Sequence, residues 1–349
     1  MPRYDTNEGT GEIFLATLKM VANRANVSVM TVSRVLNDPQ CVSDKTKERV
    51  LQAIAELNYR PNEAARIMKG KRSNILGVLV PDLDNPFHTR FLDMLEETVT
   101  PMGYRLLIAS SVTGGGLVEN LKYMLSRSVD AIVISPCSNV AEASRYILDS
   151  GIGVPVVIAD RVEPQGVIHS VYTDGYAGVK QMVEHLIGLG HKRIATIKGT
   201  AGYQTTVDRF RGYRDAMEEH GLPIDPAYIF EGEYTVEAGI QAAKYFLSLK
   251  NRPTAIVTPS DVIAVGVIHA IQKTDCRIPE DLSVTGCDGI YLGDLITPTL
   301  TTCNFSIQGI AKKVAEIIID ELDNGKNRCV TAGFQGTLKL RNSTGPAPK

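Results

Sequence analysis

Residues 17–37 read TLKMVANRANVSVMTVSRVLN, and this stretch decides how the N-terminal part of the chain folds. Thr17 is a favoured N-cap residue, and the apolar residues after it recur on one helical face: Leu18, Val21, Ala22 and Ala25. Asn26 tolerates the left-handed conformation of a tight turn, and Ser28 can cap a second helix over 29–36. The pattern therefore predicts two short helices joined by a turn.

A third helical pattern begins at Ser43, with apolar residues at helical spacing: Val50, Leu51, Ile54 and Leu57. Two helices joined by three or four residues, with the small Ala22 at their crossing, are typical of a helix-turn-helix. In that arrangement the second helix lies in the major groove of DNA. A small three-helix domain that binds another protein is the alternative interpretation.

The second helix of a helix-turn-helix presents its N-terminal side chains to base edges. Here these are Val29, Met30 and Arg34. Arg34 can pair bidentately with guanine, whereas the two apolar residues offer only contacts such as one to a thymine methyl. Phosphate contacts are expected from nearby polar residues, and the two capping residues complete the candidate set: Thr31, Ser33, Asn37, Thr17 and Ser28.

The distribution of charge agrees with a polyanion partner for the N-terminal part alone. The chain has a net charge of -2, but residues 13–72 carry six more basic than acidic residues and residues 73–349 carry six fewer. Such a basic segment on an acidic body favours nucleic-acid binding there, although a solvated charged helix face explains a modest excess equally well.

Taken together, residues 17–37 closely resemble the headpiece of the lactose/galactose repressor family. The match continues through Val42-Ser-Asp-Lys-Thr46 and Leu57-Asn-Tyr-Arg-Pro-Asn62, and the resemblance covers about 18–343. Met20 stands where the family usually has an acid, and Asn26 where Gly is common. Neither departure removes a base-reading position. The resemblance implies a transcriptional repressor that binds a near-palindromic, double-stranded operator as a homodimer.

Residues 61–73 are expected to form a hinge. Asn62 can cap a short helix over 63–69, although seven residues cannot hold a helix in isolation. The segment resembles the family's hinge helix, which folds only on operator DNA and enters the minor groove. By position in that motif Met68 would be the apolar wedge between base steps, with Ala65 beside it. An ordinary linker is the alternative.

From Asn74 onward apolar runs and helical patterns alternate, which predicts an α/β domain with parallel sheets. The predicted strands are 75–80, 105–109, 131–134, 154–159, 194–197, 255–258 and 283–287. The predicted helices are 89–102, 118–128, 175–189, 206–220, 236–249 and 261–273. The family resemblance implies two lobes of the periplasmic-sugar-binding-protein fold, with crossovers near 172–173 and 302–304.

Polar residues that follow the strands are candidates for a cleft between those lobes, because ligands bind beyond the carboxyl ends of parallel strands. Carried over from the family's motifs, the effector candidates are Asn85, Phe87, Asp160, Arg209, Ser260, Asp261 and Asp288. Asp261 begins a helix, so helix capping explains it equally well. The resemblance implies a sugar or sugar derivative. Arg161 and Arg209 would suit a phosphorylated sugar or a sugar acid, but equally a neutral sugar.

Enzyme signatures are absent from the sequence. No G-x-S-x-G elbow, phosphate loop or G-x-G-x-x-G turn occurs, and the six histidines lack metal-ligand spacing, so no catalytic residue, metal or cofactor is expected. The competing classes are a sugar-handling enzyme and a solute-binding protein of a transporter. The latter requires export, but residues 1–11 do not resemble a signal peptide.

The expected organisation is a disordered leader (1–16), a headpiece (17–60), a hinge (61–73), a sensing and dimerisation domain (74–341) and a tail (342–349). The first lobe would comprise 74–172 and 304–329, and the second 173–303 and 330–341. Six scattered cysteines and the lack of a membrane-length apolar run favour a cytoplasmic protein with no membrane partner. No C-terminal heptad helix follows, which favours a dimer over a tetramer.

Overall fold

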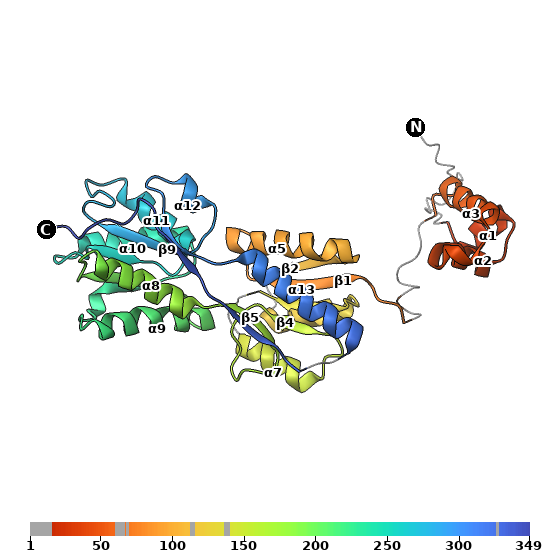
Figure 1. Cartoon of the computed structure of the whole chain (residues 1–349), viewed down its shortest axis with the longest axis horizontal. Helices are drawn as coiled ribbons and strands as arrows, with labels where there is room; N and C mark the ends of the chain where they lie inside the picture. The colour runs from red at the N-terminus through yellow and green to blue at the C-terminus, as the bar shows by residue number, and fades with distance from the viewer. Residues whose placement is uncertain (1–15, 60–66, 68–69, 112–115, 136–139, 326–327) are drawn as a thin grey trace, which may run out of the picture. The chain divides into compact units, whose positions relative to one another are not determined.

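The computed structural model describes residues 16–59, 67, 70–111, 116–135, 140–325 and 328–349. The chain divides into two compact units, 1–72 and 73–349 (Figure 1). Residues 1–15 of the expected leader, and Asn62, Ala65 and Met68 of the expected hinge helix, lie outside the described residues.

The first unit contains the three helices that the sequence predicts: α1 (Leu18–Ala25), α2 (Val29–Asn37) and α3 (Asp44–Glu56), with a 3-10 turn at Pro39–Cys41. Asn26 ends α1 in the left-handed conformation, with φ 51 and ψ 53. The apolar stripes of the three helices meet in one small core of Val21, Ala22, Ala25, Val32, Val35, Val50 and Ala53. The predicted helix-turn-helix arrangement is confirmed.

The second unit is built on two six-stranded sheets. The first has the order β11-β5-β4-β3-β1-β2, with β1 (Ile75–Val80), β2 (Arg105–Ser110), β3 (Ala131–Ile134), β4 (Val156–Ile158), β5 (His169–Thr173) and β11 (Thr331–Phe334). Its pairings are all parallel. Helices α5 (Pro86–Val99) and α13 (Ile307–Asn324) pack on one face (Figure 1), and α6 (Gly116–Ser126) and α7 (Val140–Ser150) on the other.

The second sheet has the order β12-β10-β9-β8-β6-β7. Its strands are β6 (Ile194–Lys198), β7 (Ile229–Glu231), β8 (Ala255–Val257), β9 (Ser283–Asp288), β10 (Thr301–Asn304) and β12 (Thr337–Lys339). Only β12 runs antiparallel. Helices α8 (Gly175–Gly188) and α9 (Gln204–Glu219) cover one face, and α10 (Val236–Ser248) and α11 (Asp261–Ile271) the other; a short α12 (Leu292–Leu295) follows β9.

The chain crosses between the two sheets after β5, after β10 and between β11 and β12. The expected assignment of residues 330–341 to the second lobe was therefore partly wrong. Strand β11 pairs in parallel with β5 of the first sheet, with Thr331 opposite Ser170 and Phe334 opposite Thr173. The third crossover lies between Phe334 and Thr337, because a four-residue edge strand extends the first sheet before the chain returns.

The expected tail is packed onto the second lobe. Ser343 is fully buried, and its hydroxyl donates to the Val284 carbonyl at 2.6 Å while it accepts the Thr301 N–H at 2.8 Å. The imidazole Nε2 of buried His191 lies 3.0 Å from the Gly345 carbonyl oxygen. These residues therefore complete the core of the second lobe. Across the described ranges, no helix is both long and apolar enough to span a membrane.

Candidate functional site

Helix α2 buries one face and exposes the residues predicted to read bases. Val32 and Val35 are in the headpiece core, whereas Met30 is 65% exposed and Val29 44% exposed. Arg34 is exposed as well, on the same helix. The start of α2 therefore leaves two adjacent apolar side chains and one cation available to another molecule.

The polar candidates around α2 hold the helix ends in place. The Thr17 hydroxyl accepts the Met20 N–H at 3.3 Å, and the Ser28 hydroxyl accepts the Thr31 N–H at 3.1 Å. The Asn37 amide donates to the Ser33 carbonyl at 2.7 Å and accepts from Lys71 Nζ at 2.8 Å. Capping therefore accounts for Thr17 and Ser28 structurally, and Asn37 connects α2 to the basic segment that follows the headpiece.

A cleft of ≈ 570 Å³, including the part open to solvent, lies where the carboxyl ends of strands from both lobes meet. Five predicted effector residues line it: Asn85, Phe87, Asp160, Arg209 and Asp288. The first three follow strands β1 and β4 of one lobe, and the last two belong to α9 and the end of β9 in the other.

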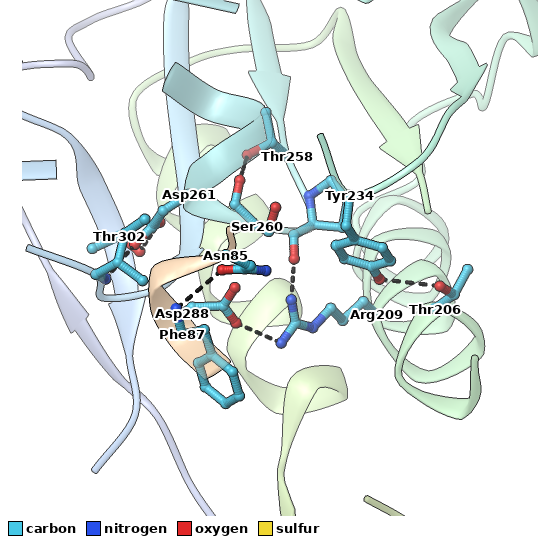
Figure 2. Close-up of polar contacts among 12 residues, drawn as sticks. Asn85, Phe87, Thr206, Arg209, Tyr234, Thr258, Ser260, Asp261, Asp288 and Thr302 are labelled. Atoms are coloured by element: carbon cyan, nitrogen blue, oxygen red, sulfur yellow. Dashed lines mark hydrogen bonds and ion pairs between the residues drawn. The ribbon is translucent and has the colours of Figure 1, made fainter. Parts of the chain in front are cut away.

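Arg209 and Asp288 form a buried ion pair at the wall of this cleft (Figure 2). The Arg209 Nη2 atom lies 2.7 Å from Asp288 Oδ1, and Nη1 donates to the Pro259 carbonyl oxygen. Asp288 has a φ of 116, a strained conformation for a residue other than Gly. Burial raises the pKa of its carboxyl group, and the Arg209 guanidinium opposes that rise.

Asp160 is the cleft carboxyl group with a free oxygen. The residue is 4% exposed, Oδ1 accepts the Arg161 N–H at 2.7 Å, and buried Oδ2 has no partner within the protein. Burial raises the pKa of this carboxyl group to about 7, while the Arg161 N–H and the charge of Arg209 act in the opposite direction. An unpaired buried oxygen is costly unless something outside the protein donates to it.

The structure does not place Ser260 and Asp261 on the lining of the cleft. Both are fully buried, and Ser260 caps α11 by accepting the Ile263 N–H at 3.3 Å. Asp261 accepts from the Thr302 hydroxyl at 2.6 Å and the Ile290 N–H at 2.8 Å. Its two oxygens thus join α11 to β10 and to the loop after β9 (Figure 2). A support role fits this geometry better than ligand contact.

Sequence reasoning missed two aromatic residues of the lining, Tyr203 and Tyr234. Their rings meet edge to face with centroids 5.8 Å apart, and the Tyr234 hydroxyl lies 3.0 Å from the Thr206 hydroxyl. They stand in the loops after β6 and β7, and only the assembled sheet shows that these loops face the cleft. The other lining residues absent from the predicted set are Pro81, Asp82, His88, Ala159, Thr173 and Thr205.

The two lobes also contact each other directly beside the cleft. Arg161 of the first lobe lies 3.5 Å from Asp208 on α9, and it also pairs with Glu163 at 2.9 Å. Phe87 forms an apolar cluster with Val262 and Ile290 of the second lobe. Any change in the spacing of the lobes must therefore alter both contacts.

Comparison with known proteins agrees with this arrangement. Residues 17–62 match the family model described as "Bacterial regulatory proteins, lacI family", and residues 183–344 match "Periplasmic binding protein-like domain". The Haemophilus influenzae protein named "Ribose operon repressor" is 31% identical over 336 residues, which is 94% of this chain and 98% of that protein. Catabolite control protein A of Priestia megaterium is 35% identical over 82% of this chain and 86% of its own.

Solved structures show the same two parts. The Lac repressor dimer bound to operator and the anti-inducer ONPF superposes with a TM-score of 0.85 at 26% identity, covering 95% of this chain and 100% of that one. The complex of the regulator CelR with cellobiose gives 0.71 at 26% identity, over 94% and 99%. The chain therefore belongs to the lacI family of bacterial regulatory proteins, and it is a DNA-binding transcriptional regulator, not an enzyme.

Proposed function

We propose that this protein is a homodimeric repressor that binds a near-palindromic operator and whose affinity is set by a small effector in the interlobe cleft. The proposal rests on one observation: the same chain carries an exposed helix face suited to DNA and a cleft suited to a small molecule. Helix α2 exposes Met30, Val29 and Arg34 on a rigid three-helix core, and the cleft holds a buried carboxyl oxygen without a partner. We expect the protein to act in the bacterial cytoplasm, bound to DNA.

The exposed face of α2 supports base reading by a small number of side chains. Met30 and Val29 can contact thymine methyl groups, and Arg34 can pair with guanine in the major groove. We expect phosphate contacts from Thr31, Ser33, Asn37 and the helix N-termini that Thr17 and Ser28 cap. For the segment outside the described residues we retain the prediction that Asn62, Ala65 and Met68 act in the minor groove.

Exposed apolar surface on both lobes supports the homodimer. Ile108 on the edge strand β2 is 43% exposed, and on the second lobe Tyr291, Leu295 and Leu340 are 64%, 72% and 60% exposed. Lys339 and Arg341, which flank Leu340, both pair with Asp294 of α12. A second copy that covers these residues would remove a large apolar area from water, and two-fold symmetry would match a palindromic operator.

Relatives support a sugar or sugar derivative as the effector. CelR is described in complex with cellobiose, and the Haemophilus influenzae relative is named for a ribose operon. In this chain, carboxyl groups, an amide and a guanidinium lie beside aromatic rings, which is how a molecule with polar edges and apolar faces is held. Asn85, Phe87, Asp160, Arg209 and Asp288 are the proposed contacts.

The test for DNA binding is selection from a pool of random duplexes, followed by sequencing of the bound fraction. We expect a palindromic consensus from the natural chain, and Arg34→Ala should lose the preference at one base pair in each half-site. Arg24→Ala is the matched control, because Arg24 is an exposed headpiece cation that pairs with Glu56 at 2.6 Å. An unchanged consensus for Arg34→Ala would show that α2 does not read bases through Arg34.

A further inference from the structure

Cys287 and Cys303 lie side by side in the core of the second lobe, and nothing in the proposed function uses them. We propose that they form a redox site: a hydroperoxide oxidises the two thiols to a disulfide, a dithiol reductant restores them, and the oxidised protein binds its operator with altered affinity. The disulfide chemistry goes beyond the proposed function, whereas the effect on operator binding rests on it.

The pairing of β9 with β10 sets the two thiols against each other. The strands run parallel with Cys287 directly opposite Cys303, and both residues are fully buried in the hydrophobic cluster that α8 and α9 cover. Neighbouring strands are about 4.7–4.9 Å apart, and a disulfide joins Cα atoms that are about 4.4–6.8 Å apart. The two sulfurs can therefore bond with only a small shift of the strands.

This arrangement suits a reversible bond better than a permanent one. Side chains stand roughly perpendicular to a sheet, so the two Cβ atoms are about as far apart as the strands, which is more than the ~3.8 Å of a relaxed disulfide. Strained disulfides are the more easily reduced ones, and in the cytoplasm disulfides are usually transient or redox-sensing. Among the cysteines in the described ranges, only Cys287 and Cys303 face each other across a sheet pairing.

The pair also keeps one of its sulfurs reactive. The Cys287 thiol donates to the Cys303 sulfur, and this bond lowers the pKa of Cys303 while it raises the pKa of Cys287 well above its usual value. Burial and the carboxyl groups of Asp288 and Asp261 oppose ionisation of Cys303, whereas the Arg209 guanidinium favours it. Because the thiolate is the form that reacts, Cys303 is the attacking sulfur and Cys287 the resolving one.

Glycine backbone covers the Cys303 sulfur on two sides. A Cβ atom at Gly178 of α8 would lie 2.7 Å from Cys303 Sγ, and one at Gly336 would lie closer still. Gly336 belongs to the crossover between β11 and β12, where the chain passes from one lobe to the other. A change in the spacing of the lobes therefore moves this cover, and a molecule as small as hydrogen peroxide can then reach the buried sulfur.

The oxidation balances with hydrogen peroxide as the one co-reactant. The Cys303 thiolate attacks a peroxide oxygen, the O–O bond breaks, and the departing hydroxide takes up the proton that the thiol had lost and becomes water. Cys303 is then a sulfenic acid. The Cys287 sulfur attacks the sulfenic sulfur to form the S–S bond, and the sulfenic hydroxyl leaves with the Cys287 proton as a second water.

Both cysteines are placed where a bond between them acts on the cleft and on a crossover. Cys287 precedes Asp288, whose carboxylate pairs with Arg209 at 2.7 Å in the cleft wall. Cys303 precedes Asn304, the last residue of β10 before the chain enters the first lobe. A disulfide that draws the ends of β9 and β10 together therefore disturbs the cleft wall and the path between the lobes at once.

The first experiment maps the cysteines of the full chain by mass spectrometry. The protein is exposed to hydrogen peroxide, unfolded and alkylated, and then digested. We expect a peptide in which Cys287 is joined to Cys303 and which disappears after treatment with dithiothreitol. Exposed Cys41 is the internal control for the oxidant. If Cys41 is oxidised while both buried thiols stay free, or if Cys303 becomes a sulfinic acid without a disulfide, the proposal is overturned.

The second experiment measures the affinity of oxidised and reduced protein for the selected operator duplex by fluorescence anisotropy. All proteins carry Cys41→Ser, because oxidation of that exposed headpiece thiol would alter DNA binding directly. We expect oxidation to change the affinity at least about fivefold, the low end of allosteric coupling, and dithiothreitol to reverse the change. An unchanged affinity of a protein whose disulfide has formed refutes the coupling to DNA.

Matched variants assign the effect to the pair. Cys303→Ser and Cys287→Ala should lose the response to peroxide, and Cys276→Ser, at a half-buried position outside the pair, should keep it. Melting temperatures establish that each variant is folded. A full response in Cys303→Ser places the redox effect elsewhere and overturns the proposal. The disulfide mapping uses neither DNA nor an effector, so it tests the redox site even if the chain selects no operator.

Discussion

Replacing Asp160 by asparagine should stabilise the effector-free protein at alkaline pH, although the substitution is made in a binding site. The buried carboxyl group has a pKa of about 7 in the folded protein, against an ordinary value of 3.8. The folded state therefore holds the proton more tightly than the unfolded chain. Ionisation of Asp160 lowers stability progressively as the pH rises from about 4 to 7, and the full cost applies above pH 7.

The magnitude follows from the shift itself. About three pKa units at about 1.4 kcal/mol each give roughly 4 kcal/mol at pH 8, which is an upper limit because solvent enters the open cleft and screens the charge. Asparagine can keep the bond from the Arg161 N–H through its carbonyl oxygen, and its amide group takes the place of the unpartnered Oδ2 atom. The variant removes the charge without losing the hydrogen bond that Oδ1 makes at 2.7 Å.

Scanning calorimetry of the full chain at half-unit steps from pH 4.5 to 8.5, without ligand, measures the effect. The melting temperature of Asp160→Asn should exceed that of the natural chain least near pH 4.5 and increasingly up to pH 7. Asp261, whose pKa burial raises to about 8, is present in both proteins and cancels in the difference. Parallel profiles, or a variant less stable at pH 8, would refute the reasoning, and Asp149→Asn, at an exposed position on α7, should leave the profile unchanged.

Three further substitutions test other parts of the structure. Leu295→Glu, at a 72% exposed position, should convert the proposed dimer to a monomer in light scattering, and a variant that keeps the mass of two chains would place the interface elsewhere. Arg209→Met should lower stability by about 3–5 kcal/mol by stranding the buried Asp288 charge, and adding Asp288→Asn should restore most of it in denaturant titration. Gly239→Ala should cost about 3 kcal/mol or more, because its Cβ would lie 2.1 Å from the Ile263 carbonyl oxygen, whereas Gly188→Ala meets nothing within 4 Å and should be neutral or mildly stabilising.

Local patterns predicted the headpiece and most of the sheet strands, because those signals lie within a single element. The caps at Thr17 and Ser28, the turn at Asn26 and the stripe of Val32 and Val35 are all readable from neighbours in the sequence. The predicted helix over 89–102 begins at Pro86 instead, because Asn85 caps it and proline is accepted in a first turn.

Two of the unpredicted elements depend on distant parts of the chain. Strands β11 and β12 have only four and three residues, too few for a local pattern to identify them, and they form where sheet edges are available. Helix α13 did carry a signal, since Ile310, Val314, Ile317 and Ile318 recur at helical spacing and are buried. That pattern alone would have identified it.

For the site, the sequence predicted which kinds of side chain line the cleft, but it did not predict the direction in which each side chain points. The family's motifs, read together with the rule that ligands lie beyond strand ends, selected Asp160, Arg209 and Asp288, and all three line the cleft. The same rule placed Asp261 there, and the structure instead turns it toward Thr302 and Ile290. Which way a side chain points from the start of a helix depends on the packing of α11 against β9 and β10, and no local pattern contains that information.

One turn of α9 both lines the cleft and contacts the other lobe. Arg209 on this turn faces the cleft and Asp288, and its neighbour Asp208 pairs with Arg161 of the other lobe. An effector that contacts Asp160 on one side and Arg209 on the other therefore acts on the same backbone that holds the lobes together. Such an effector can shift the equilibrium between two spacings of the lobes only by the difference between its binding free energies for the two. By reciprocity, an effector that weakens operator binding by a given factor must itself bind the operator complex more weakly by that factor.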